Sequence, residues 1–236
     1  MINIAEFEER IGIRFKDRAL LERVFIHRSY LNEHKGLDLE HNERLEFLGD
    51  AVLELAVTKY LYDNYDKPEG EMTSWRSALV KGESLSEEAK RLGFNDLMKT
   101  SRGEAKNLGK ARDLILANAF EALVGAIYLD QGFEVAGDFI QKNVCYKLPT
   151  ILEKGLYYDP KSRFQELSQE ALGVTPTYEV IDEHGPDHAK VFVVGSYLGE
   201  RKIAEGSGPS KQRAQTEAAR EALGVWDEII KTYNSK

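Results

Sequence analysis

The sequence lacks the cysteines, the long apolar runs and the excess of positive charge on which several classes of protein depend. It contains one cysteine, Cys145, so it can form no internal disulfide and no cysteine-based zinc site. We expect this residue to be a small, buried, apolar one. No apolar run approaches the roughly 18 residues of a membrane helix, and the N-terminus lacks a basic segment followed by an apolar one. We therefore expect a cytoplasmic protein with no membrane partner.

An excess of positive charge is also missing. The net charge is −8 over 236 residues. Residues 151–236 hold 11 Lys and Arg against 14 Asp and Glu, so neither part of the chain is basic. A generally basic surface for polyanions is excluded, and any contact with nucleic acid must be local. The length and the 42% hydrophobic content allow one large domain or two small ones.

Three carboxylates lie in a predicted helix that runs from residue 43 to about residue 60. Glu43, Glu46 and Asp50 share one face of this helix. The apolar face is formed by Leu45, Leu48, Val52, Leu55 and Ala56. The helix dipole is an equally good explanation for Glu43, which lies in the first turn. Gly49 and Asp50 lie deeper, where each costs roughly 0.5–1 kcal/mol relative to Ala. A divalent cation that prefers oxygen ligands is the simplest explanation.

A second helix is predicted over residues 113–129 and is apolar nearly all round, so we expect it to be central. The polar groups inside it are Asn118 and Glu121, on the same face. Such groups are usually satisfied by neighbouring protein groups. If the two helices pack together, however, Glu46, Asp50, Asn118 and Glu121 can surround one cation with octahedral oxygen coordination.

The rest of the first 154 residues also favours helices. Helices are predicted over residues 4–11, 72–80 and 83–92. A further helix is capped by Asp17, and a last one runs to about residue 154. Residues 32–42 and 99–112 are predicted to be polar connections, and Glu69 lies in a Pro-Gly turn. Three histidines occur at intervals of seven residues: His27, His34 and His41. Pairs of metal ligands on a helix are three or four residues apart, so we do not expect a metal site there.

The character of the chain changes after residues 155–159, which we interpret as a linker. We predict a helix over 161–172, strands over 177–181, 189–194 and 201–205, and a closing helix over 210–223, with turns at Gly185-Pro186 and Gly199. This α-β-β-β-α order indicates an α+β unit over residues 160–227 with two helices on one face of a sheet.

Residues 42–53, NERLEFLGDAVL, closely resemble the signature of bacterial ribonuclease III. Residues 160–225 are similar to the double-stranded RNA-binding domain that this family carries in the same position. The resemblance implies an all-α endonuclease domain over residues 1–154, then the linker, then the binding domain. It also implies a homodimer with double-stranded RNA across an acidic valley, and one Mg²⁺-dependent site per subunit, which Mn²⁺ can also serve.

In this family each site cuts one strand and leaves 5′-phosphate and 3′-hydroxyl ends with short 3′ overhangs, in ribosomal RNA precursors and other transcripts. The resemblance assigns roles residue by residue. The metal and catalytic residues are Glu46, Asp50, Asn118 and Glu121; the valley residues are Glu43 and Glu69; the dimer contact is Phe47; the RNA-binding residues are Gln165, Glu166, His188, Ser210, Lys211 and Arg213.

Two positions depart from the family pattern. Asn118 stands where the family usually has Asp, and an amide gives one carbonyl oxygen but no charge and no base. We expect weaker metal binding, and two functions stay open: an active endonuclease, and a duplex-binding protein with impaired cleavage. Gln212 replaces a second Lys, which leaves a thinner phosphate anchor. Residues 206–211 lack the ending of a phosphate-binding loop and follow no parallel strand, so we expect no nucleotide cofactor.

A third function also stays open, a helical scaffold whose carboxylates are merely solvated. Whether Glu46 and Asp50 are buried and face Glu121 distinguishes it from the other two.

Overall fold

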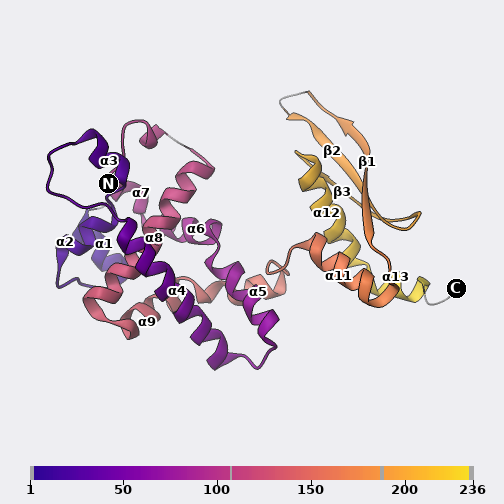
Figure 1. The fold of residues 1–236 in the computed structure, drawn as a ribbon, viewed down its shortest axis with the longest axis horizontal. Helices are drawn as coiled ribbons and strands as arrows, with labels where there is room; N and C mark the ends of the chain where they lie inside the picture. The colour runs from indigo at the N-terminus through magenta and orange to yellow at the C-terminus, as the bar shows by residue number, and fades with distance from the viewer. Residues whose placement is uncertain (1–2, 107, 187–188, 234–236) are drawn as a thin grey trace. The chain divides into compact units, whose positions relative to one another are not determined.

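A computed structural model describes residues 3–106, 108–186 and 189–233. The chain divides into two compact units, residues 1–157 and 158–236 (Figure 1). The first unit is helical, and the second is a three-stranded antiparallel sheet with helices. The predicted fold class, an all-α domain followed by a small α+β domain, is confirmed. No helix in the described ranges is long and apolar enough to cross a membrane.

Ten α-helices and two short 3₁₀ helices form the described part of the first unit. Their bounds are α1 Ile4–Ile11, α2 Arg18–Val24, α3 Arg28–Glu33, α4 Glu43–Asn64, α5 Glu69–Val80, α6 Gly82–Leu92, α7 Phe94–Leu97, η1 Glu104–Lys106, α8 Lys110–Gln131, α9 Phe133–Asn143, η2 Cys145–Lys147 and α10 Leu148–Glu153.

Two details of the first unit differ from the prediction. The last helix does not run unbroken to residue 154 but ends at Asn143. Pro149 lies in the first turn of α10, and a continuous helix would press its ring against the carbonyl of Cys145. Glu69 lies in the first turn of α5 rather than in a loop, directly after Pro68. A carboxylate is favourable there because the N-terminal end of a helix is positive.

The two long helices α4 and α8 lie side by side (Figure 1). Their backbones touch at Gly49 and Gly125. A Cβ atom on Gly49 would lie 1.8 Å from the carbonyl oxygen of Glu121, and one on Gly125 would lie 2.3 Å from the carbonyl oxygen of Leu45. Only glycine fits at both positions. Gly49 is therefore explained by helix packing, and the interpretation of it as a cost of cation binding was wrong.

The core of the first unit surrounds α8, which is buried on most of its circumference as predicted. Against it, the rings of Phe7, Phe25 and Phe94 meet edge to face at 5.1–5.4 Å between centroids. The predicted apolar face of α4 is buried at Leu45, Val52 and Ala56 and half-buried at Leu48. The prediction was wrong for one residue of that face, because the side chain of Leu55 is 59% exposed.

The second unit has the predicted order of elements, with one addition. Its bounds are α11 Pro160–Leu172, β1 Pro176–His184, β2 Val191–Leu198, β3 Arg201–Gly208, α12 Lys211–Gly224 and α13 Trp226–Tyr233. The strands pair antiparallel in the order β1-β2-β3, with a bulge between Val180 and Asp182. Helix α13 was not predicted; it closes the small core by packing Trp226 and Ile229 against Phe164.

Helix α12 lies directly on the sheet, which explains why it is rich in alanine. A Cβ atom on Gly206 of β3 would lie 2.0 Å from the backbone nitrogen of Ala218. The hydroxyl of Ser196 on β2 donates to the carbonyl of Ala218 at 3.2 Å. The face of α12 that meets the sheet is made of Ala214, Ala218, Ala219 and Ala222, all buried. Small side chains permit this close approach of α12 to the sheet. The approach in turn sets the position of the first turn of α12.

Gly49→Ala is expected to destabilise the first unit by about 3 kcal/mol, because the new methyl group would force α4 away from α8. The control is Gly137→Ala on α9, where an added Cβ would meet no atom within 4 Å. That change is expected to stabilise the helix by about 0.5–1 kcal/mol. Chemical denaturation of the two variants measures both effects, and equal stability of the two would contradict the packing argument.

Candidate metal centre

The packing of α4 on α8 gathers the four predicted site residues. Glu46 and Asp50 come from α4, and Asn118 and Glu121 come from α8. Glu46, Asn118 and Glu121 are half-buried, whereas Asp50 is exposed. Asp50 and Glu46 act electrostatically on Glu121, and the side chain of Asn118 hydrogen-bonds to Glu46. The structure thus places one exposed carboxylate at the edge of a partly buried acidic cluster.

The pKa values of two of these carboxyl groups reflect their crowding. Burial, and then the charges of Asp50 and Glu46, raise the pKa of Glu121 to about 7. Burial, and then the charge of Glu43, raise the pKa of Glu46, while the hydrogen bond from Asn118 opposes that rise. No described cation forms an ion pair with Glu121. A group that carries several negative charges and no positive one is stabilised by a bound cation.

The chemistry of these donors fits a hard divalent cation, which prefers carboxylate and carbonyl oxygen. The coordination shell is not assembled: among residues 3–106, 108–186 and 189–233, no group of three or more His, Cys, Asp or Glu is arranged to hold a metal ion. The amide of Asn118 is instead engaged with the carboxylate of Glu46. Binding a cation would therefore require small side-chain movements that draw the carboxylates together.

The two predicted valley residues lie on different helices. Glu43, exposed at the start of α4, is 3.5 Å from Nη1 of Arg28 and 3.8 Å from Nδ1 of His41. Its charge also acts on Glu46, so it belongs to the surroundings of the cluster. Glu69, exposed at the start of α5, accepts a hydrogen bond from the hydroxyl of Thr73 at 3.0 Å.

The histidines take part in local contacts. His27 Nδ1 accepts from the backbone N–H of Ser29 and caps α3. His34 stacks on the ring of Tyr30, with centroids 4.1 Å apart.

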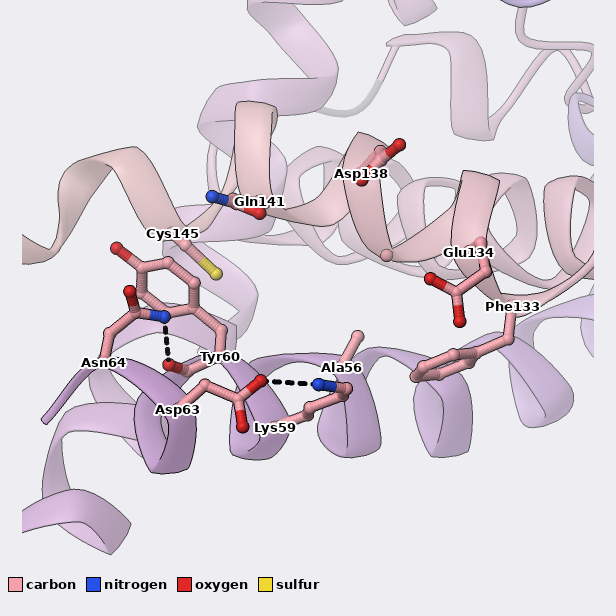
Figure 2. A pocket seen from close by; sticks show the side chains of 11 residues that line it. Ala56, Lys59, Tyr60, Asp63, Asn64, Phe133, Glu134, Asp138, Gln141 and Cys145 are labelled. Atoms are coloured by element: carbon pink, nitrogen blue, oxygen red, sulfur yellow. Dashed lines mark hydrogen bonds and ion pairs between the residues drawn. The ribbon is translucent and has the colours of Figure 1, made fainter.

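A hollow of about 160 Å³ lies between α4 and α9, away from this cluster (Figure 2). Two pairs of its polar groups interact: Lys59 donates to Asp63, and the amide of Asn64 donates to the carbonyl of Tyr60 at 2.8 Å. Cys145 also lines it. Burial raises the pKa of this thiol to about 12, so the thiol stays protonated and is no nucleophile. The prediction of a small, buried cysteine is confirmed.

A second hollow, of about 570 Å³, opens beside the predicted dimer contact. Phe47 forms part of its wall, yet the side chain is 83% exposed. Leu45, Leu48 and Leu129 add apolar surface to the same hollow. An exposed aromatic ring beside an apolar hollow is the kind of surface that a protein partner covers.

The predicted RNA-binding residues that the structure describes in the second unit lie on α11, at the N-cap of α12 and in its first turn. Gln165 and Glu166 are exposed on α11. Ser210 caps α12 by accepting from the backbone N–H of Arg213 at 3.3 Å. Lys211 and Arg213 are exposed in the first turn of α12, where the helix end adds partial positive charge. His188 lies outside the described residues.

One residue that positions the site was not predicted from the sequence. Gly125 lies opposite Gly49 and permits the contact that brings α8 against the acidic face of α4. The available signal was a glycine inside an otherwise apolar helix, which often marks a close approach of two backbones.

Comparison with known proteins settles the family. A protein-family model described as Ribonuclease-III-like matches residues 17–148, and a family model described as a double-stranded RNA binding motif matches residues 160–225. The chain belongs to the ribonuclease III family. It is accordingly an endoribonuclease that carries a double-stranded RNA-binding domain, as the resemblance of the signature predicted.

Relatives named ribonuclease 3 cover nearly the whole chain. The protein from Oceanobacillus iheyensis is 45% identical over 226 residues, which are 94% of this chain and 97% of that protein. The protein from Chloroflexus aurantiacus is 44% identical over 95% of this chain and 92% of its own length. The chain is also similar to a solved nuclease domain of ribonuclease III from Campylobacter jejuni, which is described as flexible in a region involved in dimer formation. The two are 39% identical with a TM-score of 0.54, and the match covers 60% of this chain and 98% of the solved domain.

The raised pKa of Glu121 predicts a pH-dependent stability. A carboxyl group whose pKa is higher in the folded than in the unfolded protein makes its full contribution to stability at pH values below the unfolded pKa. For Glu121 this contribution is lost as the pH rises through its folded pKa of about 7. Glu121→Gln is therefore expected to raise the stability of the metal-free ribonuclease at pH 8, on the order of 1–3 kcal/mol, and to change it little at pH 4.5.

Thermal unfolding of the metal-free protein at both pH values measures this effect. Glu9→Gln on α1 is the control, because Glu9 is exposed whereas Glu121 is half-buried, and it should show the pH dependence of the unchanged protein. If Glu121→Gln behaved in the same way as the control, the account of the buried carboxyl would be wrong.

Proposed function

We propose that this ribonuclease III hydrolyses both strands of double-stranded RNA in a reaction that depends on a divalent cation, with Mg²⁺ as the physiological ion and Mn²⁺ as a substitute. The observation that carries the proposal is the half-buried Glu121, whose carboxyl group is crowded by Asp50 and Glu46 across the α4–α8 packing. Such a cluster costs stability unless a cation binds there.

Each side chain of the cluster has a distinct part in the proposal. Glu46, Asp50 and Glu121 would hold the cation, and Asn118 would orient Glu46 through their hydrogen bond. A bound divalent cation supplies a more acidic water and stabilises negative charge on the phosphate. Asp50 is the most exposed of these groups, so it faces the side from which substrate arrives. Glu121 must lose its proton to act as a ligand, so cation affinity should rise as the pH passes 7.

The second unit would bind the duplex by shape and charge rather than by base sequence. A-form RNA hides its bases in a deep groove and displays phosphates and 2′-hydroxyls. Gln165 and Glu166 would face one minor groove and His188 the next, while Lys211 and Arg213, after the cap at Ser210, would contact phosphates. Cleavage would leave 5′-phosphate and 3′-hydroxyl ends.

The cellular role follows from the family resemblance. We propose that the substrates include ribosomal RNA precursors and other transcripts with duplex segments, and that the enzyme acts in the cytoplasm, where these are made. Glu43 and Glu69, both exposed, would line the acidic valley and influence how the RNA is processed. A two-fold dimer would place two sites on one duplex, and offset cuts would give short 3′ overhangs.

A duplex-binding protein with impaired cleavage is the second candidate, and Asn118 is the observation that favours it. Its amide satisfies Glu46 without a cation and adds no negative charge. The scaffold alternative is judged by whether Glu46 and Asp50 are buried and face Glu121. Glu46 is half-buried and Asp50 is exposed, but both act on the half-buried Glu121, and this disfavours a scaffold with merely solvated carboxylates.

Replacing Asn118 with Asp distinguishes the two candidates. Asn118→Asp adds a charged ligand, so half-maximal cleavage of a long duplex should need roughly tenfold less Mg²⁺ than in the unchanged enzyme. The unchanged enzyme should still cleave at millimolar Mg²⁺. Direct Mn²⁺ binding, measured by calorimetry, should tighten by a similar factor. An unchanged enzyme without activity, restored fully by Asn118→Asp, would instead establish the binding protein.

The exposed ring of Phe47 predicts a second result. In a two-fold dimer the same patch meets itself, so each Phe47 would enter the apolar hollow of the partner subunit. Phe47→Asp should raise the dimer dissociation constant at least about 100-fold, because a central aromatic anchor is lost and a charge is buried.

Sedimentation equilibrium measures the dimer. Tyr62→Asp is the control, since Tyr62 lies on the same helix and is 78% exposed but does not line that hollow. A Phe47→Asp protein that stays as dimeric as the control would refute this interface.

A further inference from the structure

A hollow of about 320 Å³ lies in the second unit between α11 and α12. Lys161 and Gln165 line it from α11, Gln212 lines it from α12, and Tyr178 of β1 lines it from the sheet. It is therefore flanked by two groups of residues that the proposed function assigns to RNA, the exposed face of α11 and the first turn of α12. Lys161 is a basic residue in this hollow to which neither the sequence analysis nor the comparisons assign a role.

The ammonium group of Lys161 is held in place by two contacts. Its Nζ donates to Oε1 of Gln215 at 2.7 Å. It also lies 5.0 Å from the centre of the Tyr178 ring. Both partners leave the positive charge intact, since one is a neutral amide and the other is an aromatic face.

Two other lysines of the unit are paired with carboxylates. Lys190 pairs with Glu183 at 3.2 Å, and Lys202 pairs with Glu205 at 2.6 Å. Within the described residues, no carboxylate lies within ion-pairing distance of Lys161. Asp159 lines the same hollow, where its carboxylate caps α11 by accepting the backbone N–H of Ser162 at 2.9 Å, and its charge acts on Tyr178. It forms no ion pair with Lys161. The positive charge of Lys161 thus stays available to an anion.

The first turn of α12 is short of positive charge where Lys161 approaches it. Lys211 and Arg213 are basic, but Gln212 and Gln215 are neutral. Lys161 crosses from the neighbouring helix to Gln215 and so brings an ammonium group to the neutral side of this turn.

We propose that Lys161 is an additional RNA-binding residue, which holds a backbone phosphate of double-stranded RNA at the hollow between α11 and α12. This inference rests on the proposed binding of duplex RNA by the second unit. Gln212, which lines the hollow, offers an amide donor to the same phosphate. Because Gln215 and Tyr178 already restrict the lysine, less side-chain entropy is lost on binding.

The salt dependence of binding tests this directly. Affinity of the full chain for a duplex of about 20 base pairs is measured in EDTA, without cleavage, at several salt concentrations. Each lost phosphate contact lowers the slope of log affinity against log salt by about 0.9 or less. Lys161→Ala should therefore lower the slope by nearly one and weaken binding about five- to tenfold at ~0.1 M salt, equally for unrelated sequences.

Two controls separate this role from a structural one. Lys161→Met keeps a long unbranched side chain without the charge and should lose the same slope as Lys161→Ala, with an unchanged melting temperature. Lys202→Ala removes a lysine that is paired with Glu205, so it should leave the slope unchanged.

Moving the charge provides the strongest test. In the Lys161→Ala protein, Gln212→Lys places a lysine on the other wall of the same hollow and should restore the slope and the affinity. If Lys161→Ala and Lys161→Met keep the full slope while Lys211→Ala lowers it, the inference is wrong and the proposed function stands. An unchanged chain without salt-dependent duplex binding would overturn both.

Discussion

The contact between the backbones of α4 and α8 is the constraint on which the rest of the first unit depends. At Gly49 and Gly125 the helices approach so closely that neither position has room for a methyl group. The approach brings Glu46 and Asp50 of one helix against Glu121 of the other. An apolar core surrounds α8, so burial of that core holds the carboxylates together against their mutual repulsion. The acidic cluster is thus a consequence of packing rather than of local helix preference.

The contacts proposed for the cation and for RNA involve only a few residues in each unit, which reconciles an acidic chain with an RNA substrate. In the first unit, one group of carboxylates lies where a cation can neutralise it, and burial, together with the charges of Asp50 and Glu46, raises the pKa of Glu121. In the second unit, a few exposed basic groups lie at the first turn of α12, and Ser210 caps the helix beside them. The net charge of −8 therefore argues against a broad basic surface, and not against local contacts with phosphates.

Much of the fold could be predicted because long periodic segments specify their own structure. Helices α4 and α8 were predicted from the pattern of apolar residues, and the three strands from alternation and glycine turns. The reason for Gly49 could not be predicted, since it depends on a helix about 70 residues away. The exposure of Leu55 also depends on neighbours that a local pattern does not contain. The end of α9, in contrast, had a local signal in Pro149. The contact of Lys161 with Gln215 joins two helices that are separated by the whole sheet in sequence.

The central claim is that the packing of α4 on α8 creates one divalent-cation site. Anomalous diffraction from crystals of the unchanged protein soaked in Mn²⁺ tests it most directly. The account predicts a peak about 2–2.5 Å from carboxylate oxygens of Glu46, Asp50 and Glu121, a distance typical of oxygen ligands. No peak there, with the ion bound instead by Asp63, Glu134 and Asp138 in the hollow between α4 and α9, would contradict it.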